Sequence, residues 1–332
     1  MVAIGMRPTG KQPASKSAAK AESIKFGSLL VAPTMLVLAV VVAYPMLSAV
    51  RQSLYGPEGI DSRTGFVSDT EPFVGLQNYS AVFTEAGGRF WNAFGNTAFL
   101  TATSVALETA LGIGMALIMH RALRGRALIR ASILVPWAIP TAIVALLWRW
   151  IFNADGVANA ILPGTTLWTT EGFHAKLAVI FAETWKTAPF IGLLVLAGLQ
   201  LIPKETYEAA KVDGAGPWRR FISITLPLVK PALLVAVLFR ILDSLRMFDM
   251  PYVLIGARKE SVETLSMLAH DEAMNVRFGP GAAYAVLLFL FVFLVAFTFV
   301  KVLGADVVGD AAPAPSRRTR RKARAREEVS SS

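Results

Sequence analysis

The stretch EAAKVDGAGPWRRFISITLP, residues 208–227, lies between two of the most apolar runs of the chain. It holds five ionisable side chains and two prolines, whereas each neighbouring run is long enough to cross a membrane as a helix. Pro203 suits the first position of a helix, Gly214 suits the left-handed residue that ends one, and Pro217 can open another. The pattern therefore predicts a polar insert, 204–221, made of a helix, a tight turn and a second helix at a membrane surface.

The composition places the rest of the chain in a membrane. Of the 332 residues, 54% are hydrophobic and 17% are charged, and the mean hydropathy is +0.52. A soluble chain of this length would need more charge to cover its surface. Six runs are long enough to cross a hydrocarbon core, so the sequence predicts an all-α integral membrane fold with six transmembrane helices in residues 28–303. The spans are predicted near 28–50, 97–119, 131–152, 177–200, 228–250 and 281–303.

The two ends differ from this region in composition. Residues 1–27 and 304–332 are basic and rich in Ala, Pro and Ser, so both are expected to be disordered tails. The first apolar run lacks a small-residue cleavage site and is expected to stay as a membrane anchor. Lys and Arg gather in both tails and in the loops after the second and fourth spans, which predicts cytoplasmic termini and a cytoplasmic insert. Because these residues flank apolar runs, the net charge of +10 indicates orientation in lipid rather than nucleic-acid binding.

The sequence contains no recognisable catalytic motif. The segment GMRPTGKQ, residues 5–12, has the spacing of a phosphate-binding loop, but Gln12 stands where a Ser or Thr hydroxyl should reach magnesium, and no strand precedes it. The chain has no cysteine, which excludes disulfides, zinc thiolates and thiol catalysis. The three histidines are too far apart in sequence to suggest a metal site: His120, His174 and His270. We therefore expect no cofactor or metal on this chain.

The insert has the composition of a docking surface. Ala209 and Ala210 present almost no side chain, so a partner could approach closely there, and Glu208 and Asp213 offer charges. The alternative is an amphipathic loop helix that rests on lipid headgroups. Such a helix usually carries bulky apolar residues and lysines, whereas this one carries an alanine pair and acids.

The spacing of the insert resembles the signature loop of permease subunits of ABC importers. The matching residues are Glu208, Ala209, Ala210, Asp213, Gly214, Ile224, Leu226 and Pro227. Four stretches resemble the maltose-type, carbohydrate-uptake branch of that binding-protein-dependent family: FVGLQNYSAVF (73–83), NTAFLT (96–101), ILVPWAIPTAIVALLWRWIFN (133–153) and LAGLQLIPKETYEAAKVDGA (196–215). One loop departs from the family, since IGARKESVETL (255–265) stands where a glycine-rich TGGGP run is usual.

This resemblance implies a permease subunit of an ATP-driven importer for a carbohydrate, in a bacterial cell membrane. In the family the insert is a coupling helix that sits in a cleft of a cytoplasmic ATPase. The implied partners are two cytoplasmic ABC ATPase subunits, a second homologous permease, and an external sugar-binding protein or lipoprotein. ATP and magnesium would then be bound by the ATPase subunits. The Ala- and Arg-rich tails look similar to trehalose-uptake permeases of actinobacteria, which favours a di- or oligosaccharide such as trehalose.

Ionisable residues inside predicted spans are costly in lipid and are candidates for a translocation pathway. The fifth span holds a row of four charges spaced three apart, the fourth span holds two more, and the second holds Glu108. The candidates in the fourth and fifth spans are Glu183, Lys186, Arg240, Asp243, Arg246 and Asp249. By their depth, Lys186, Asp243 and Arg246 are predicted to form a polar cluster in the outer half of the bilayer. The cluster could line a path for a hydroxyl-rich solute or only fix helix packing.

Other interpretations stay open at this point. Trp148, Trp150 and Trp185 suit an interfacial aromatic belt or a sugar-stacking surface. An ion-gradient-driven secondary transporter would use the intramembrane acids as a proton site, although six spans show no second half. A membrane scaffold or channel, and an ABC permease for a polyol or glycerol phosphate, are further alternatives.

Overall fold

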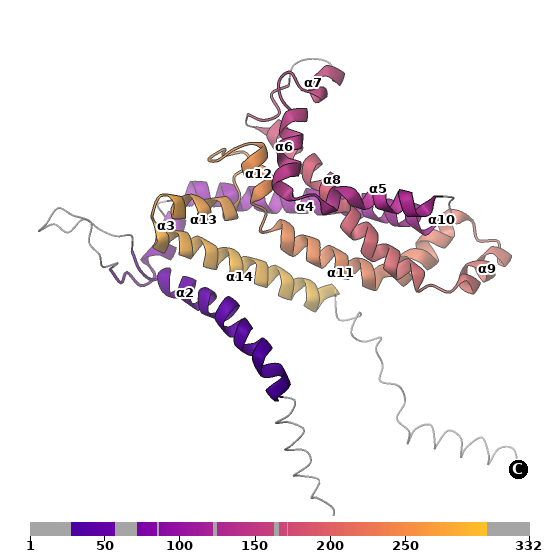
Figure 1. The fold of residues 1–332 in the computed structure, drawn as a ribbon, viewed down its shortest axis with the longest axis horizontal. Helices are drawn as coiled ribbons and strands as arrows, with labels where there is room; N and C mark the ends of the chain where they lie inside the picture. The colour runs from indigo at the N-terminus through magenta and orange to yellow at the C-terminus, as the bar shows by residue number, and fades with distance from the viewer. Residues whose placement is uncertain are drawn as a thin grey trace, which may run out of the picture. The chain divides into compact units, whose positions relative to one another are not determined.

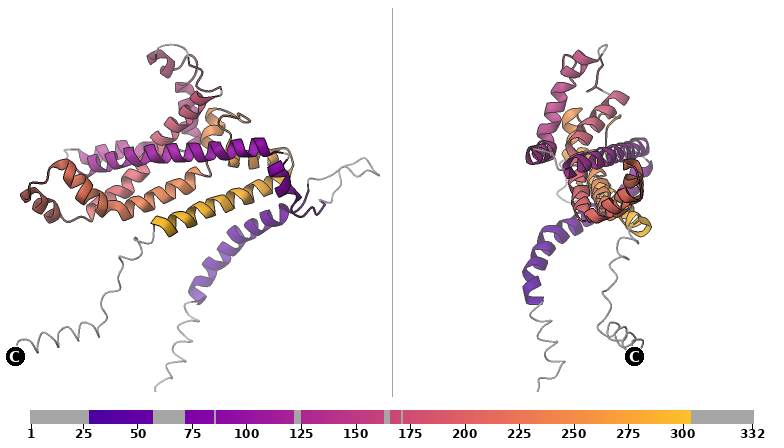
Figure 2. Two further views of the ribbon diagram at one scale, coloured as in Figure 1. Left: turned by 180° about the vertical axis from the view of Figure 1, so that it is seen from behind. Right: turned by 90° about the vertical axis from the view of Figure 1, so that its right-hand side faces the viewer.

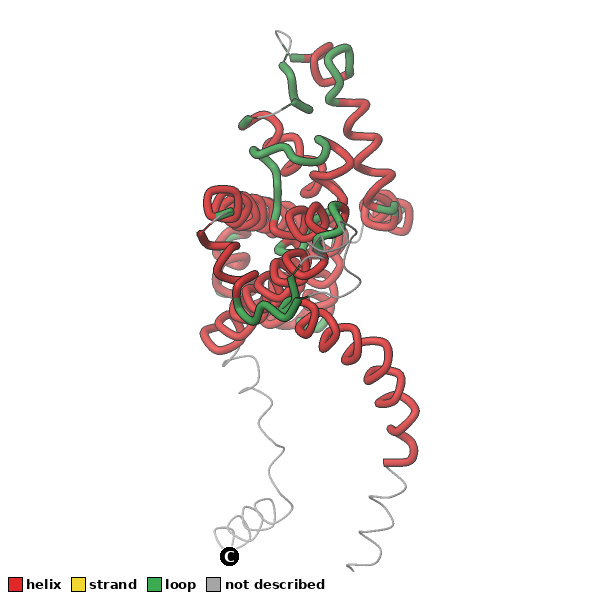
Figure 3. The backbone as a smooth tube through the Cα atoms, turned by 90° about the vertical axis from the view of Figure 1, so that its left-hand side faces the viewer, coloured by secondary structure: helices red, strands yellow, loops and turns green. Residues whose placement is uncertain are grey.

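The computed structural model describes residues 28–56, 72–84, 86–121, 125–162, 166–170 and 172–303. The predicted tails and the GMRPTGKQ segment lie outside these residues. The chain divides into two compact units, Met1–Gln52 and Ser53–Ser332, which are described separately. Throughout the described residues the elements are helices and loops, apart from one isolated antiparallel bridge between Tyr55 and Phe73 (Figure 3).

The first unit is an apolar helix from Ser28 to Gln52. It contains a π-helical turn, η1 (Ala39–Ala43), which is followed by α2 (Tyr44–Gln52). No residue of η1 or α2 is buried, and the helix is long enough to cross a membrane. It contains the first predicted span, 28–50.

The second unit is built on four long apolar helices that lie side by side (Figures 1 and 2). They are α4 (Gly87–His120), α8 (Phe173–Gln200), α11 (Leu226–Ser244) and α14 (Phe278–Leu303). α4 packs along α8 in the most extensive contact of the unit, and α11 packs on both. Short helices close the two ends. α9 (Lys204–Val212) and α10 (Pro217–Arg220) lie at one end, and α3 (Gln77–Thr84) and α13 (Leu265–Met274) lie at the other.

Small residues allow α4 and α8 to approach closely. A Cβ atom on Gly112 of α4 would lie 2.8 Å from the Cβ atom of Ile191 and 3.0 Å from the carbonyl oxygen of Ala188. In return, a Cβ atom on Gly192 of α8 would lie 3.2 Å from the carbonyl oxygen of Gly112. Glycine at such contacts is typical of membrane helices, where van der Waals packing replaces the hydrophobic drive. α4 and α8 therefore form the tightly packed centre of the unit.

The third predicted span, 131–152, is two helices rather than one. α5 (Arg126–Ala138) and α6 (Thr141–Ile151) are bent by 94° relative to each other. Ile139 at the break is extended, because it precedes Pro140 and a proline disfavours helical geometry in the residue before it. Two other prolines, Pro136 and Pro189, lie inside α5 and α8 without interrupting them. α6 packs on α12 (Asp249–Leu254) and α8, and it carries α7 (Val157–Ile161) away from the four long helices (Figure 1).

Three predicted boundaries differ from the structure. α4 begins at Gly87 rather than near 97, because its polar and aromatic first turns lower the local hydropathy. The fifth span was predicted to reach 250, but α11 ends at Ser244. The second helix of the insert was predicted to be separate from the fifth span, 228–250. Instead α10, a π-helical turn η2 (Phe221–Thr225) and α11 follow one another without a break from Pro217 to Ser244.

Candidate functional site

The insert begins with a helix whose end is fixed by backbone hydrogen bonds. α9 starts after Pro203, and Gly214 adopts the left-handed conformation with φ +73°. The N–H of Gly214 donates to the carbonyl of Lys211 at 3.1 Å, and the N–H of Ala215 donates to the carbonyl of Ala210 at 2.9 Å. This pair of bonds is a Schellman motif, which satisfies the last carbonyls of a helix. The turn between α9 and α10 is therefore closed by main-chain geometry.

The outer face of the insert carries unpaired charges and exposed apolar side chains. Glu208, Ala209 and Asp213 are exposed, whereas Ala210 is buried with 7% of its surface exposed. Only one alanine of the pair therefore lies on the surface, contrary to the prediction for both. No hydrogen bond or ion pair joins the charged side chains of α9 and α10 to other side chains in the described part of the chain. Three large apolar side chains are mostly exposed beside them: Leu201, Val212 and Trp218.

The remaining residues of the signature lie on the rising helix. Ile224 is half-buried in η2, Leu226 is half-buried at the start of α11, and Pro227 is exposed. Pro227 directly follows η2 within the continuous helix from Pro217 to Ser244, so its missing N–H leaves out one hydrogen bond there. The insert is thus one continuous unit with a long apolar helix.

A second feature is a buried cluster of charges centred on Arg240, which we call the Arg240 cluster (Glu108, Glu183, Arg240 and Asp243). Arg240 Nε and Nη2 donate to the Glu108 carboxylate at 2.7 and 3.0 Å. Nη2 also donates to Glu183 at 3.0 Å, and Nη1 donates to Asp243 at 2.5 Å. The Thr187 hydroxyl donates to Glu108 at 2.7 Å. The cluster therefore joins α4, α8 and α11 through one guanidinium.

The members of the cluster differ in exposure. The side chains of Glu108, Arg240 and Glu183 are 0%, 4% and 8% exposed, whereas that of Asp243 is 65% exposed. Arg246, 64% exposed, lies 4.0 Å from Asp243. The Arg240 cluster thus extends from the centre of the helix packing to the surface of α11.

The predicted cluster was partly wrong. Lys186, Asp243 and Arg246 were expected to form its centre, but Lys186 is buried without a hydrogen bond or ion pair to any described residue. Arg246 lies in the turn after α11 and Asp249 opens α12, so neither extends the row of charges along one helix. Glu108 was noted as the ionisable residue of the second span but was not placed in the predicted cluster, because its partners lie on other helices.

At the other end of the four long helices, ion pairs fix the segment that departs from the family. Arg89 of α4 donates to Glu263 at 2.9 and 2.6 Å and to Asp271 at 2.9 Å. Arg258 donates to Asp271 at 2.8 Å. Burial alone would raise the pKa of Asp271, but the hydrogen bonds from Arg89 and Arg258 outweigh it and hold the pKa below its ordinary value. The segment 255–265 is therefore attached to α4 by the ion pair of Glu263 with Arg89, at the place where a glycine-rich run is usual in the family.

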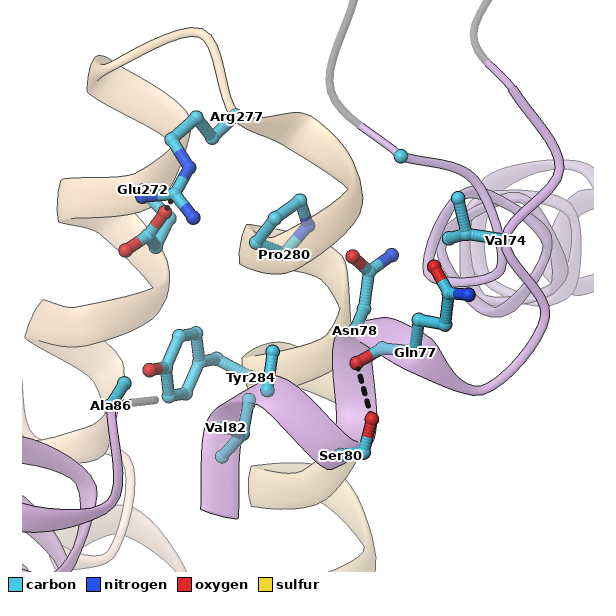
Figure 4. Close-up of a pocket in the computed structure, with 12 residues that line it drawn as sticks. Val74, Gln77, Asn78, Ser80, Val82, Ala86, Glu272, Arg277, Pro280 and Tyr284 are labelled. Carbon is cyan, nitrogen blue, oxygen red and sulfur yellow. Dashed lines mark hydrogen bonds and ion pairs between the residues drawn. The ribbon is translucent and has the colours of Figure 1, made fainter. Parts of the chain in front are cut away.

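A pocket of about 540 Å³ lies at this same end, between α3, α13 and the start of α14 (Figure 4). Its polar lining includes Gln77 and Asn78 of α3, with Glu272, Arg277 and Tyr284 from the opposite wall. Arg277 Nε lies 3.2 Å from Glu272 Oε2. None of the predicted pathway residues lines it.

The tryptophans form part of an aromatic group on α6 and α8. Trp148 stacks on Phe152 with ring centroids 5.1 Å apart and meets Trp185 edge-on at 5.9 Å. The Trp148 indole N–H is buried and has no acceptor among the described residues. Trp150 is 67% exposed and is not part of this group.

These features define a membrane transport protein: several apolar helices, one broken span, a polar insert and charges within the spans. Residues 108–307 match the model of a family described as binding-protein-dependent transport system inner membrane component, and the chain belongs to that family. It is a permease subunit. The prediction of an all-α membrane permease that resembles the importer family is confirmed.

Two of the relatives are named as permeases for trehalose or maltose. The trehalose transport system permease protein SugA of Mycobacterium tuberculosis is 37% identical over 305 residues, 89% of this chain and 94% of that protein. The trehalose/maltose transport system permease protein MalF of Thermococcus litoralis is 38% identical over 289 residues, 85% and 95% of the two chains. A chain of a bacterial alginate ABC transporter, solved in complex with an alginate pentasaccharide-bound periplasmic protein, has the same fold. Its TM-score is 0.71 at 20% identity, over 86% of this chain and 95% of that one.

Proposed function

We propose that this permease imports a di- or oligosaccharide, with trehalose as the first candidate, and is driven by ATP hydrolysis on partner subunits. The observation that carries the proposal is the insert, in which α9 exposes uncompensated charges and continues through α10 into a span. This surface also exposes the acids Glu205, Glu208 and Asp213, which anionic lipid headgroups would repel, so it fits a protein partner better than lipid. The partners would be two cytoplasmic ABC ATPase subunits, which would bind ATP and magnesium.

The distribution of Lys and Arg supports a cytoplasmic insert and cytoplasmic termini in a bacterial cell membrane. In this orientation the α3–α13 end faces outward, where an external sugar-binding protein or lipoprotein would deliver the solute. A second, homologous permease would complete the pathway. The two relatives with trehalose in their names, both more than a third identical to this chain, support the choice of solute.

In the proposed mechanism, closure of the ATPase subunits moves α9, and the spans switch between inward-open and outward-open arrangements. Glu208, Ala209, Asp213 and Gly214 would contact the ATPase. A ligand can shift such an equilibrium only through different contacts in the two states, and the nucleotide-dependent ATPase cleft supplies this difference.

The proposed pathway follows the exposed side of the Arg240 cluster. Asp243 and Arg246 are about two-thirds exposed near the end of a membrane-spanning helix, and charges at such positions face water or protein rather than lipid. They would present acceptors and donors to a hydroxyl-rich solute. Glu183, Lys186 and Arg240 lie behind them, and Asp249 lies beyond them on α12. The buried members fix the helices that carry the exposed ones.

The test is uptake of labelled trehalose by proteoliposomes that contain the assembled transporter and its external binding protein. We expect ATP-dependent accumulation that persists when the proton gradient is collapsed. E208R should abolish co-purification of the ATPase subunits and uptake. E205R, on the same exposed helix but outside the signature, should retain most of both. Uptake that depends on an ion gradient and not on ATP would establish the secondary-transporter alternative. If a polyol or glycerol phosphate competes for uptake and trehalose does not, trehalose is the wrong solute.

A further inference from the structure

A hydrogen bond between two hydroxyls links the two arms of the insert. The Tyr207 hydroxyl of α9 lies 3.2 Å from Thr225 Oγ1, which ends η2. Thr225 is 6% exposed and Tyr207 is half-buried. Because water has little access to Thr225, removal of the Tyr207 hydroxyl would leave the Thr225 hydroxyl with only its 3.4 Å hydrogen bond to the carbonyl of Arg220. The bond thus contributes to how α9 is held against the start of the span.

The bond meets the helix at its one irregular turn. In η2 the N–H of Leu226 donates to the carbonyl of Phe221, five residues back, instead of four. The Thr225 hydroxyl donates to the carbonyl of Arg220 at 3.4 Å, so the same side chain contacts the turn and α9. Single π-helical turns inside α-helices are frequent at functional sites, because they add one residue and locally alter the ladder of hydrogen bonds.

A side-chain contact adds to the chain connections of α9. The chain joins α9 to α8 through Pro203 and to α10 through the Schellman turn. The Tyr207–Thr225 contact attaches α9 directly to η2, about two turns back along α9 from Gly214. From Thr225 the helix continues without a break to Arg240, about 22 Å away at about 1.5 Å per residue. A displacement of α9 can therefore pass along one rigid element to the Arg240 cluster.

We propose that Tyr207 and Thr225 are positioning residues that transmit movement of α9 to α11. The proposal rests on the proposed function, since it assumes that an ATPase moves α9. It adds that the coupling passes through this hydroxyl pair and not only through the chain connection at Gly214. Loss of the pair lets α9 move with its ATPase while α11 lags behind.

The experiment measures solute imported per ATP hydrolysed in proteoliposomes of the full complex, for Y207F, T225V, T225S and the Y207F/T225V double variant. We expect Y207F and T225V each to lower this ratio by about 2- to 10-fold, the size of one net hydrogen bond. The double variant should be no worse than the more affected single variant, and T225S should stay near wild type. T206V, which removes a neighbouring hydroxyl of α9 that has no bond in the described residues, is the matched control and should be unchanged.

Co-purification of the ATPase subunits and the ATPase rate separate this role from a purely structural one, since misfolding lowers the amount of complex but not the ratio. If the wild-type complex imports solute with ATP, and Y207F and T225V import as much solute per ATP as wild type, the role of the hydroxyl pair is refuted while the proposed function stands. Fully multiplicative losses in the double variant, or a T225S ratio as low as that of T225V, would also overturn that role. A wild-type complex without ATP-driven uptake would overturn the proposed function, and this inference with it.

Discussion

Replacement of Arg240 by methionine tests the central role of the Arg240 cluster. Methionine keeps an unbranched apolar stem, although a shorter one, and removes the guanidinium, which makes four hydrogen bonds to three carboxylates. Glu108, 0% exposed, and Glu183, 8% exposed, would then face each other without a cation between them. Breaking a buried ion pair by removal of one partner costs about 3–5 kcal/mol, because the remaining charge stays buried. The expected fall in melting temperature is on the order of 10 °C.

The assay is thermal unfolding of the purified protein in detergent, read by loss of the monodisperse peak in size-exclusion chromatography. R246M is the matched control, because it makes the same change in a side chain that is 64% exposed and 4.0 Å from its partner. Exposed pairs of this kind contribute less than about 1 kcal/mol, so R246M should melt near wild type. The E108M/R240M double variant should be more stable than R240M alone, because an apolar replacement of both partners removes the unpaired charge of Glu108.

The reasoning fails if R240M melts within about 2 °C of wild type, which corresponds to less than about 1 kcal/mol. It also fails if E108M/R240M is less stable than R240M, since the cost would then come from lost packing volume rather than from unpaired charge.

Three further outcomes are expected. G112V should destabilise the α4–α8 contact by about 1–3 kcal/mol through overpacking, because a Cβ atom there lies 2.8 Å from α8, whereas G114V, with nothing within 4 Å, should melt near wild type. Asp271 has a pKa below its ordinary value of 3.8, so its contribution to stability is present above about pH 4 and is lost as the pH falls through the lowered pKa. The difference in melting temperature between wild type and D271N should therefore be constant from neutral pH down to about pH 5 and shrink below pH 4; a difference that grows in acid would contradict the assignment. G214V should cost about 1–2 kcal/mol because φ is +73°, and should reduce ATPase co-purification, whereas G216V at an ordinary φ should not.

Local signals explain why the insert could be predicted closely. Pro203, Gly214 and Pro217 each act within a few residues, through a missing N–H or a tolerated positive φ, so α9 and the turn follow from the sequence alone. Burial of Ala210 did not follow, because it depends on which face of α9 packs inward. The π-helical turn η2 did not follow either, since no residue type marks it.

The charges show where sequence reasoning ends. The four charges of 240–249 form a row spaced three apart in the sequence, and the structure keeps one contact of that row, between Arg240 and Asp243. The main partner of Arg240 is Glu108, 132 residues away, and such a pairing depends on how α4 and α11 rotate against each other. The end of α11 at Ser244 separates Arg246 and Asp249 from the row, and the apolar sequence around them gave no stop signal. The break at Pro140 has a local cause in the proline, but Pro136 and Pro189 lie inside helices, so a proline alone does not identify a break.

The Arg240 cluster also restricts how hybrids with related permeases can be built. Its members come from α4, α8 and α11, so exchange of any one of these helices would leave carboxylates and guanidinium mismatched across the new junctions. A functional chimera must take the three helices as a set. α14 contributes no group to the cluster and is a candidate for exchange by itself, provided that its contacts with α13, α3 and α11 are kept.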